Sequence, residues 1–269
     1  MEDLKKLFAE VKEKNDKTKR LTRTEKKEAE ENSKNAAIDA AMAEETKEEV
    51  VDPLEFAPEV DVLSKFDGEW QDATAGIKKW DEKKAKIDEL ATACTNVKIK
   101  PASTESLTKF LKKEIGNSNM NIVMSAIKAA AAIQVGMKKD FAAGTKDLIG
   151  AILLKGKEKR PMILADVQTF LDGSMAATNM EAIAEEFIPM LTNVAPGVKA
   201  LTVKFVETAC QVTYIDVLQR IQNDLLPAMA KAMDDKDGGV RDLALHCMGI
   251  LKGRLGESVM SKYLKDVNA

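Results

Sequence analysis

The stretch LLPAMAKAMDDKDGGVRDLALHCMGILKGRLG, residues 225–256, predicts a pair of antiparallel helices and decides how the rest of the chain is interpreted. In its first half, Leu225, Met229 and Met233 recur every four residues, and Leu226 lies beside them. This is the spacing of a helix with one buried face.

A turn separates this helix from the next one. Residues 234–239 hold three aspartates and two glycines, a composition typical of turns, and Asp237 is placed to cap the helix that follows. Apolar residues then recur at helical spacing again: Val240, Ala244, Cys247 and Leu251. A hairpin of this kind cannot bury its apolar face alone, so we expect neighbouring hairpins of the same design.

Composition favours helices over sheets. The 269 residues are 45% hydrophobic, 32% charged and only 4% aromatic, which suits helices packed through aliphatic side chains and excludes a wholly disordered chain. The length fits two average domains or one solenoid equally well. A net charge of −3 gives no overall attraction to nucleic acid, so electrostatic binding requires local clusters of charge.

Three widely separated cysteines, Cys94, Cys210 and Cys247, lie in apolar helical stretches, as reduced core thiols of intracellular proteins do. The N-terminus lacks the apolar core of a signal peptide, and no run approaches the roughly twenty apolar residues that span a bilayer. We therefore expect a soluble cytosolic or nuclear protein without a membrane partner.

The first fifty residues differ from the remainder. They are rich in Lys and Glu, and Leu4, Phe8 and Val11 form their only apolar cluster, so they bury too little apolar surface to fold alone. We interpret residues 1–50 as a charged tail or linker and residues 51–269 as one helical domain. We expect the large apolar residues at the start of that domain to dock on the helices that follow: Phe56, Val60, Val62, Leu63 and Phe66.

Four further hairpins precede the one at residues 225–256. Asp81 and Ser103 are expected to cap helices, and Pro161 to occupy a first helical turn. One residue in each of the five turns marks a period of about 36 to 43 residues, the period of HEAT-type repeats: Trp80, Met120, Pro161, Gly197 and Val240. The sequence thus predicts an all-α solenoid of HEAT-type hairpins forming a flat paddle.

The expected buried faces of these hairpins follow from the same spacing. They are Ile87, Leu90, Ala91 and Cys94; Leu107, Phe110, Leu111, Ile115, Ile122, Ala126, Ala129 and Ile133; Leu148, Ile149, Ile152, Leu153, Leu164, Val167 and Leu171; and Ile183, Phe187, Met190, Leu191, Val198, Leu201, Phe205 and Ala209. A last short helix, carrying Val259, Met260, Tyr263 and Leu264, is expected to cover the open end.

Catalytic chemistry finds little support in the sequence. The single histidine, His246, sits within a helix and is interpreted as structural, and clusters of His and Cys that could hold a transition metal are absent. The stretch at Lys155 lacks the spacing of a phosphate-binding loop. Carboxylates are expected on solvated helix faces. We therefore expect a protein that is not an enzyme and uses no cofactor or metal.

The turns inside the hairpins are more informative, because stacking brings all five to one edge of a solenoid, which we call the turn edge. Its residues are biased towards positive charge. For any single lysine, simple solvation is the better explanation, but the set as a whole favours a binding edge. Its residues are Lys78, Lys79, Trp80, Asn119, Met120, Lys155, Lys157, Lys159, Arg160, Asn193, Lys199, Lys236 and Arg241, against the acids Glu158, Asp234, Asp235 and Asp237.

The two tryptophans have different expected roles. Trp80 lies between lysines and an aspartate, a poor setting for a core residue, and exposed aromatics flanked by cations are frequent anchors for protein partners. Packing remains the alternative for Trp80. Trp70 is assigned to packing.

These residues resemble the TOG domains of the XMAP215/Dis1/ch-TOG microtubule polymerases, and the second TOG domain most of all. The resemblance covers about residues 51 to 266. Residues 1–50 resemble the end of a preceding TOG domain and a linker, which implies further TOG domains in the parent chain. The matching runs are DPLEFAPEVDVLSKF, IKKWDEKKAKIDEL, VGMKKDF, GKEKRP and GVRDLALHCMGILKGRLGE.

This resemblance implies binding of the curved αβ-tubulin heterodimer through the turn edge, as part of a microtubule polymerase or plus-end regulator. It implies a location on the cytoskeleton, at microtubules, spindle poles or the centrosome. Trp80 would contact β-tubulin and Arg241 α-tubulin. The residues implied in tubulin binding are Trp80, Lys79, Asn119, Met120, Lys157, Lys159, Arg160, Asn193, Lys199 and Arg241.

Two turns depart from the family pattern. The fourth reads Asn193-Val194-Ala195-Pro196 where the family often has Asn-Lys-Asn-Pro, which leaves Lys199 as the expected cation. In the fifth, Gly238-Gly239 predicts a less rigid setting for Arg241 and weaker binding at the α-tubulin end. A HEAT scaffold for another acidic protein, or for nucleic acid, remains the alternative.

Overall fold

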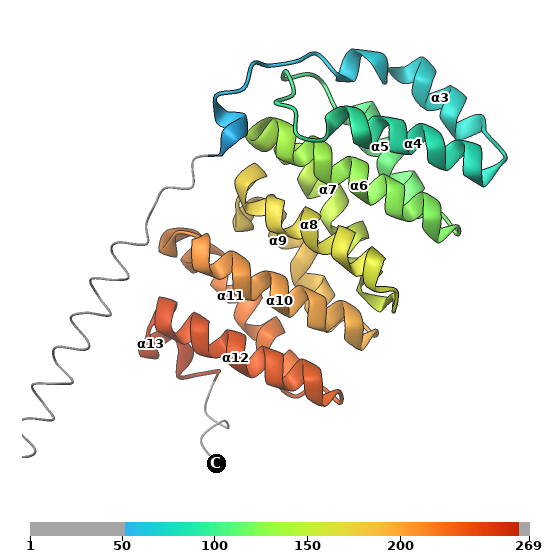
Figure 1. Cartoon of the computed structure of the whole chain (residues 1–269). Coiled ribbons are helices and arrows are strands. Elements are labelled where there is room, and N and C mark those ends of the chain that lie inside the picture. Colours follow the sequence, from blue (N-terminus) through green and yellow to red (C-terminus); the bar gives the residue numbers. More distant parts are fainter. Residues whose placement is uncertain (1–51, 264–269) are drawn as a thin grey trace, which may run out of the picture. The chain divides into compact units, whose positions relative to one another are not determined.

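The computed structural model describes residues 52–263, and its helices belong to one compact unit. Residues 1–50, interpreted above as a tail, and Leu264 lie outside the described residues. The predicted all-α solenoid is confirmed (Figure 1). Its five hairpins are α3 (Gly68–Gly76) with α4 (Trp80–Cys94), α5 (Glu105–Ile115) with α6 (Met120–Met137), α7 (Ala142–Leu153) with α8 (Pro161–Ala177), α9 (Met180–Phe187) with α10 (Pro196–Val212), and α11 (Ile215–Met233) with α12 (Gly238–Leu255).

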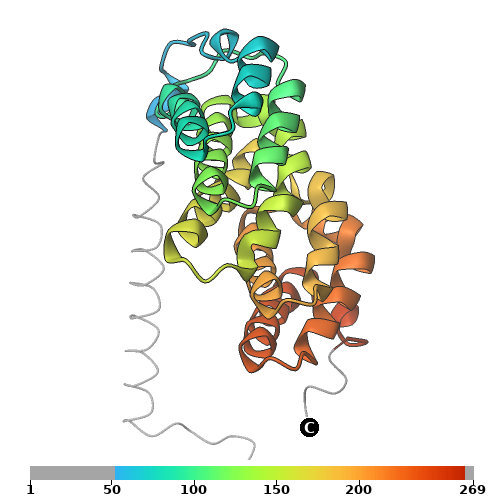
Figure 2. The same cartoon turned by 90° about the vertical axis from the view of Figure 1, so that its right-hand side faces the viewer.

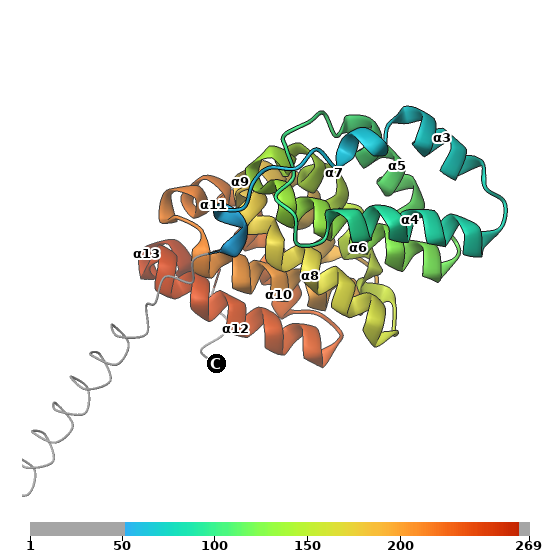
Figure 3. The same ribbon diagram turned by 45° about the horizontal axis from the view of Figure 1, so that its top comes forward.

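The hairpins stack so that their helices form two layers. The second helices, α4, α6, α8, α10 and α12, follow one another in one layer, and the first helices α3, α5, α7, α9 and α11 form the other (Figure 3). Two short 3₁₀ segments precede α3, η1 (Pro53–Glu55) and η2 (Leu63–Lys65). Three others lie between helices: η3 (Lys138–Phe141), η4 (Leu154–Lys157) and η5 (Ile188–Thr192). The short α13 (Glu257–Met260) packs against α12, as expected of a final covering helix.

The core lies between the layers and consists of the predicted apolar faces. Most of the expected residues are buried, but Leu164, Met190, Leu201 and Met233 are only half-buried. In α8, Ile163 faces the core instead of Leu164. The expected docking of the leading segment is wrong for Phe56, which is 80% exposed. The side chain of Val60 is exposed as well. Val60 contacts the linker between α4 and α5 through its backbone, because its carbonyl oxygen accepts the N–H of Lys100 at 2.9 Å.

Helix starts follow the predicted caps in part. Asp237 accepts the N–H of Val240 and Pro161 begins α8, as predicted. Asp81 and Ser103 are not caps: α4 starts one residue before Asp81, which therefore lies in the first helical turn, and α5 starts after Thr104. A carboxylate in a first turn is still favourable, because it faces the positive end of the helix dipole.

The three cysteines are buried and free, as expected, and burial raises the pKa of the Cys94 and Cys210 thiols to about 12. One helical stretch among the described residues, Met120–Lys157, is long and apolar enough to cross a membrane by composition, although no apolar run in the sequence predicted it. Lys138, with a φ of 49°, breaks this stretch between α6 and α7, and 67% of its apolar window is buried against neighbouring helices.

Candidate protein-binding edge

The five turns inside the hairpins lie along one edge of the unit, as predicted. They are the segments between α3 and α4, α5 and α6, α7 and α8, α9 and α10, and α11 and α12. Figure 2 views the structure from this side. The arrangement follows from topology, because every hairpin starts its second helix at the same end of the stack.

The first turn presents an aromatic ring and a lysine that forms an ion pair with a glutamate. Trp80 begins α4 and is 48% exposed. The ammonium of Lys79 lies 2.8 Å from Glu82 Oε1, and both side chains are largely exposed. Trp70, by contrast, packs edge-on against Phe66 and Phe110, with ring centroids 4.9 and 5.7 Å away, as predicted for a packing residue.

In the second turn, polar side chains shape the backbone. The Oδ1 of Asn119 accepts the N–H of Asn121 at 2.9 Å and so caps α6, and the Oδ1 of Asn117 accepts the N–H of Asn119 at 2.9 Å. Met120 is half-buried and packs against the core. The implied contact residues of this turn therefore also hold its conformation.

The third turn carries the densest positive charge. Lys157, Lys159 and Arg160 are all exposed. Lys155 is buried, and burial, followed by repulsion from Lys157, lowers the pKa of its ammonium. The accessible cations of this turn are thus the three that the resemblance implied.

The fourth turn does not present the cation that the sequence led us to expect. Lys199 is 11% exposed and pairs with Asp235, which is 13% exposed, so its ammonium lies inside the edge. Instead, Val194 stands at the tip of the turn and is 96% exposed. The Oδ1 of Asn193 accepts the N–H of Ala195 at 3.0 Å and fixes the backbone around Val194.

The fifth turn is braced, so the less rigid setting that Gly238-Gly239 predicted for Arg241 is wrong; the weaker binding predicted for this end stays a prediction. The guanidinium Nη1 of Arg241 donates to the carbonyl oxygens of Asp235 at 2.8 Å and Lys236 at 3.2 Å. Asp235 Oδ1 also accepts the N–H of Asp237 at 3.0 Å. Both glycines lie in the first turn of α12, where helical hydrogen bonds and the Asp237 cap hold them.

Contacts between neighbouring turns fix their spacing. Lys83 Nζ lies 3.2 Å from Glu114 Oε1, and Asn117 Nδ2 donates to Glu114 Oε2 at 2.9 Å, which joins the first hairpin to the second turn. Glu114 is 1% exposed, so the expectation that carboxylates lie on solvated faces is wrong for this residue. The same Lys83 ammonium donates to the carbonyl of Ala75 at 3.1 Å.

The third and fourth turns touch through glycines. A Cβ atom on Gly197 would lie 2.3 Å from the carbonyl oxygen of Gly156, and one on Gly156 would lie 2.8 Å from the carbonyl oxygen of Gly197. The Lys199–Asp235 pair then joins the fourth turn to the fifth. Most of the edge is therefore held as one surface.

Sequence reasoning missed the apolar groups on this edge. Met162, in the first turn of α8, is 65% exposed, and Val194 was noted only as a departure from the family pattern. The exposure of Met162 could have been predicted from the helical spacing of apolar residues, because Met162 falls outside the stripe formed by Ile163, Val167 and Phe170. Apolar points interspersed with cations are typical of protein-binding surfaces.

Histidine and metal chemistry receive no support from the described residues. His246 is 67% exposed, not a core residue, and its Nδ1 lies 3.2 Å from Glu207 Oε1. No group of three or more His, Cys, Asp or Glu side chains within residues 52–263 is placed to hold a metal ion.

No protein-family model matches the chain, but curated relatives do. The chain is 28% identical to centrosomal protein 224 of Dictyostelium discoideum, over 87% of its own length and 12% of that protein. It is 29% identical to protein mini spindles of Drosophila melanogaster, over 82% of its own length and 11% of that protein. The chain therefore spans about an eighth of the length of these relatives.

Solved structures agree with the curated relatives. A structure described as the structural basis of microtubule plus end tracking by XMAP215, CLIP-170 and EB1 has a TM-score of 0.67 and 28% identity, over 78% of this chain and 88% of that chain. Another, from work on tubulin recruitment by microtubule polymerases with TOG domain arrays, shares the fold with a TM-score of 0.70 at 20% identity, over 80% of this chain and 46% of that chain. The resemblance to TOG domains of the XMAP215/Dis1/ch-TOG family is thereby confirmed.

Proposed function

We propose that this chain, a TOG domain of the XMAP215/Dis1/ch-TOG kind, binds the curved αβ-tubulin heterodimer through its turn edge and serves a microtubule polymerase or plus-end regulator. The single observation that carries the proposal is the braced row of five turns, with exposed Trp80 at one end and Arg241 at the other. Relatives named for centrosomes and spindles support this function, and they support a location on the cytoskeleton as well.

The chemistry of the edge suits an acidic globular partner. Trp80 supplies an aromatic surface that loses water on contact, and Lys157, Lys159 and Arg160 attract acidic groups and speed the encounter. Stacked helices lie roughly 8 to 10 Å apart, so five hairpins give an edge about 40 Å long, enough to cross the boundary between two subunits. Met162 and Val194 add apolar contacts between the charged turns.

A rigid edge also distinguishes partner shapes. A surface of fixed spacing fits one curvature of a two-subunit partner better than another, so straightening of the partner would favour release. One domain holds one heterodimer. Polymerase activity is therefore a proposal for an array, in which tethering raises the effective tubulin concentration.

Gel filtration with unpolymerised tubulin tests the proposal. We expect the wild-type domain to co-elute with tubulin at one to one, and the variant Trp80→Ala/Lys159→Glu to elute separately with unchanged helical circular dichroism. The matched control is Tyr214→Ala/Lys204→Glu, which removes an aromatic that is 81% exposed and changes the charge equally, away from the turn edge.

The same protein samples also test the alternative, a scaffold that binds nucleic acid. A salt-titrated RNA mobility shift of the wild-type domain, together with no co-elution with tubulin, would favour the nucleic-acid scaffold and contradict the proposal. Persistent tubulin binding by Trp80→Ala/Lys159→Glu would contradict the assignment of the edge.

A further inference from the structure

A chain of side-chain hydrogen bonds connects the first turn of the edge with the second. Lys83, near the start of α4, donates to the carbonyl oxygen of Ala75 near the end of α3 at 3.1 Å. The same ammonium lies 3.2 Å from Oε1 of Glu114, in the last turn of α5. Because Ala75 and Lys83 lie on either side of the first turn, this lysine ties together the two helices that the turn connects.

The other carboxylate oxygen of Glu114 holds the second turn. Its Oε2 accepts a hydrogen bond from Nδ2 of Asn117 at 2.9 Å. The Oδ1 of Asn117 then accepts the N–H of Asn119 at 2.9 Å, and the Oδ1 of Asn119 accepts the N–H of Asn121 at 2.9 Å. One carboxylate therefore holds both turns, with one oxygen for each.

Trp80 and Met120 lie at the two ends of this chain. The backbone N–H of Lys83 bonds to the carbonyl oxygen of Lys79, directly before Trp80, at 3.1 Å. Met120 begins α6 directly after its cap, Asn119. The side chains that the first two turns offer to a partner are thus fixed through the same carboxylate.

Stability alone does not require charges at this place. Glu114 is 1% exposed and Lys83 is 9% exposed. Taking two charges out of water costs free energy that a buried ion pair often does not recover, so apolar side chains of similar size are frequently as stable. Apolar side chains, however, cannot donate to the carbonyl of Ala75 or accept from Asn117. The charged pair therefore supplies what the two turns need and the core does not.

We propose that Glu114 is a positioning residue of the turn edge: acting through Lys83 and Asn117, it holds the first two turns in the register in which Trp80 and Met120 contact the partner together. This role rests on the tubulin binding proposed above. Two turns that are already in place lose less conformational freedom on binding than two turns that move independently, so the affinity is higher. Glu114 itself is too deeply buried to touch the partner.

Amide hydrogen exchange of the free domain, followed by nuclear magnetic resonance, tests the positioning without tubulin. In Lys83→Met/Glu114→Leu we expect exchange at least about fivefold faster at the N–H groups of Ile77 and Asn119, one in each turn. The N–H of Ala195, which a side chain of the fourth turn holds in the same way, is expected to exchange as in the wild type. Unchanged exchange at Ile77 and Asn119 would overturn the proposal.

Isothermal titration calorimetry with unpolymerised tubulin gives the functional readout. We expect Lys83→Met/Glu114→Leu to bind at least about tenfold more weakly than the wild type, with a denaturation midpoint close to that of the wild type. Binding within about twofold of the wild type would overturn the proposal. If the wild-type domain does not bind tubulin, the function proposed for the edge fails, whereas the exchange measurement still decides whether Glu114 positions the turns.

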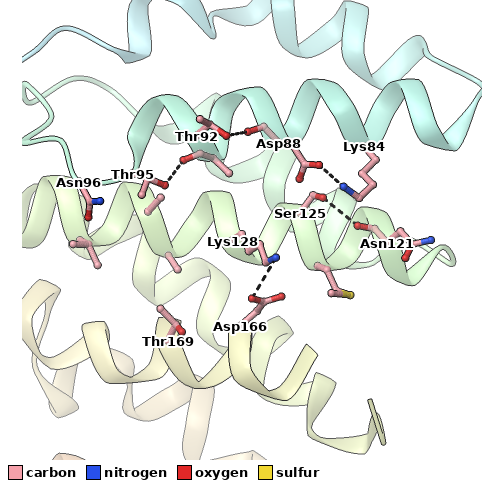
Figure 4. A pocket seen from close by; sticks show the side chains of 15 residues that line it. Lys84, Asp88, Thr92, Thr95, Asn96, Asn121, Ser125, Lys128, Asp166 and Thr169 are labelled. Carbon is pink, nitrogen blue, oxygen red and sulfur yellow. Dashed lines mark hydrogen bonds and ion pairs between the residues drawn. The ribbon is translucent and has the colours of Figure 1, made fainter. Parts of the chain in front are cut away.

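The matched control is Lys128→Met/Asp166→Leu. This pair joins α6 to α8 along the bodies of the helices, where Lys128 Nζ lies 3.9 Å from Asp166 Oδ1 (Figure 4). Its removal deletes the same two charges between neighbouring hairpins, and neither side chain is hydrogen-bonded to a turn among the described residues. We expect tubulin affinity within about twofold of the wild type. Equal weakening by the two double variants would overturn the proposal, because the loss of any ion pair between hairpins would then suffice.

Asn117→Ala separates the two arms of the chain and leaves the buried ion pair intact. We expect faster exchange at Asn119 but not at Ile77, because only the link to the second turn is lost. Tubulin affinity is expected to lie between that of the wild type and that of Lys83→Met/Glu114→Leu. Faster exchange at both N–H groups, or at neither, would contradict the assignment of one carboxylate oxygen to each turn.

Discussion

Trp80 is expected to contribute most to the proposed contact, because it is the large aromatic side chain of the edge, is 48% exposed, and tryptophan is the residue type most enriched among binding hot spots. We expect Trp80→Ala to weaken tubulin binding about thirtyfold, or about 2 kcal/mol. Isothermal titration calorimetry measures the change, with Tyr214→Ala as the aromatic control. An affinity within twofold of the wild type would contradict the role of Trp80.

Val194 offers a gain-of-function test. It occupies the position where the family often has lysine, and at 96% exposure a substitution leaves the fold unaffected. If the partner surface is acidic, Val194→Lys is expected to strengthen binding a few-fold at low salt and to steepen the salt dependence, because a new charge pair is screened by ions. Unchanged affinity at every salt concentration would show that this turn does not face the partner.

Single residues were the hardest feature to predict. Lys199 was expected to be accessible, but its partner Asp235 lies 36 residues further along the chain, and no local pattern reports such a pair. Likewise, the sequence showed two flexible glycines beside Arg241 but not the carbonyl oxygens that its guanidinium holds. Exposure of Trp80, in contrast, was predictable from its charged neighbours.

At the scale of elements, the turns are spaced by backbone contact as well as by helix packing. Gly197 meets Gly156 so closely that a methyl group on Gly197 would lie 2.3 Å from a carbonyl oxygen. We expect Gly197→Ala to destabilise the domain by about 1–3 kcal/mol and to weaken tubulin binding, because the third and fourth turns must separate. Denaturant unfolding and calorimetry measure both effects.

Gly238→Ala is the matched control for that substitution. A Cβ atom there would lie 3.5 Å from Arg241 Nη2, an ordinary contact, so the change is expected to be neutral or to stabilise by about 0.4–1 kcal/mol. If Gly197→Ala and Gly238→Ala destabilise the domain equally, the loss at Gly197 does not come from the close approach of the third and fourth turns.

The buried pair of Lys83 and Glu114 joins the first two hairpins. Glu114→Ala leaves the Lys83 ammonium without its carboxylate, and we expect a loss of about 3–5 kcal/mol in unfolding free energy. The double variant Lys83→Met/Glu114→Leu is expected to recover most of that loss, because apolar replacements need no charge partner. Chemical denaturation measures both. If the double variant is as unstable as Glu114→Ala, the loss of unfolding free energy comes from altered packing and not from the unpaired Lys83 charge.

Helix positions were predictable for a physical reason. Apolar spacing and turn composition act within a few residues, so the five hairpins, the Asp237 cap and Pro161 at the start of α8 followed from the sequence. Asp81 was predicted as the cap, two residues after the actual cap position at Lys79, because a Lys-Lys-Trp turn gives no cap signal of its own. Contacts between elements, such as the pair of Lys83 and Glu114, form only in the stacked structure and could not be predicted from the sequence.

At the scale of the whole molecule, the described unit combines a rigid edge with an uneven distribution of charge. The third turn concentrates the accessible cations, whereas the fifth mixes Lys236 and Arg241 with three aspartates. We therefore expect the middle of the edge to speed the encounter with the partner and the two ends of the edge to provide selectivity. The fold could be predicted from the repeat period, but which cations remain free on its surface could not.

Hydrogen–deuterium exchange of the domain with and without unpolymerised tubulin shows whether the turn edge is the binding surface. We expect slower exchange in the five turns, above all around Trp80 and Arg160, and unchanged exchange at residues 212–214 on the opposite edge. Protection at residues 212–214, with the turns around Trp80 and Arg160 unchanged, would contradict it.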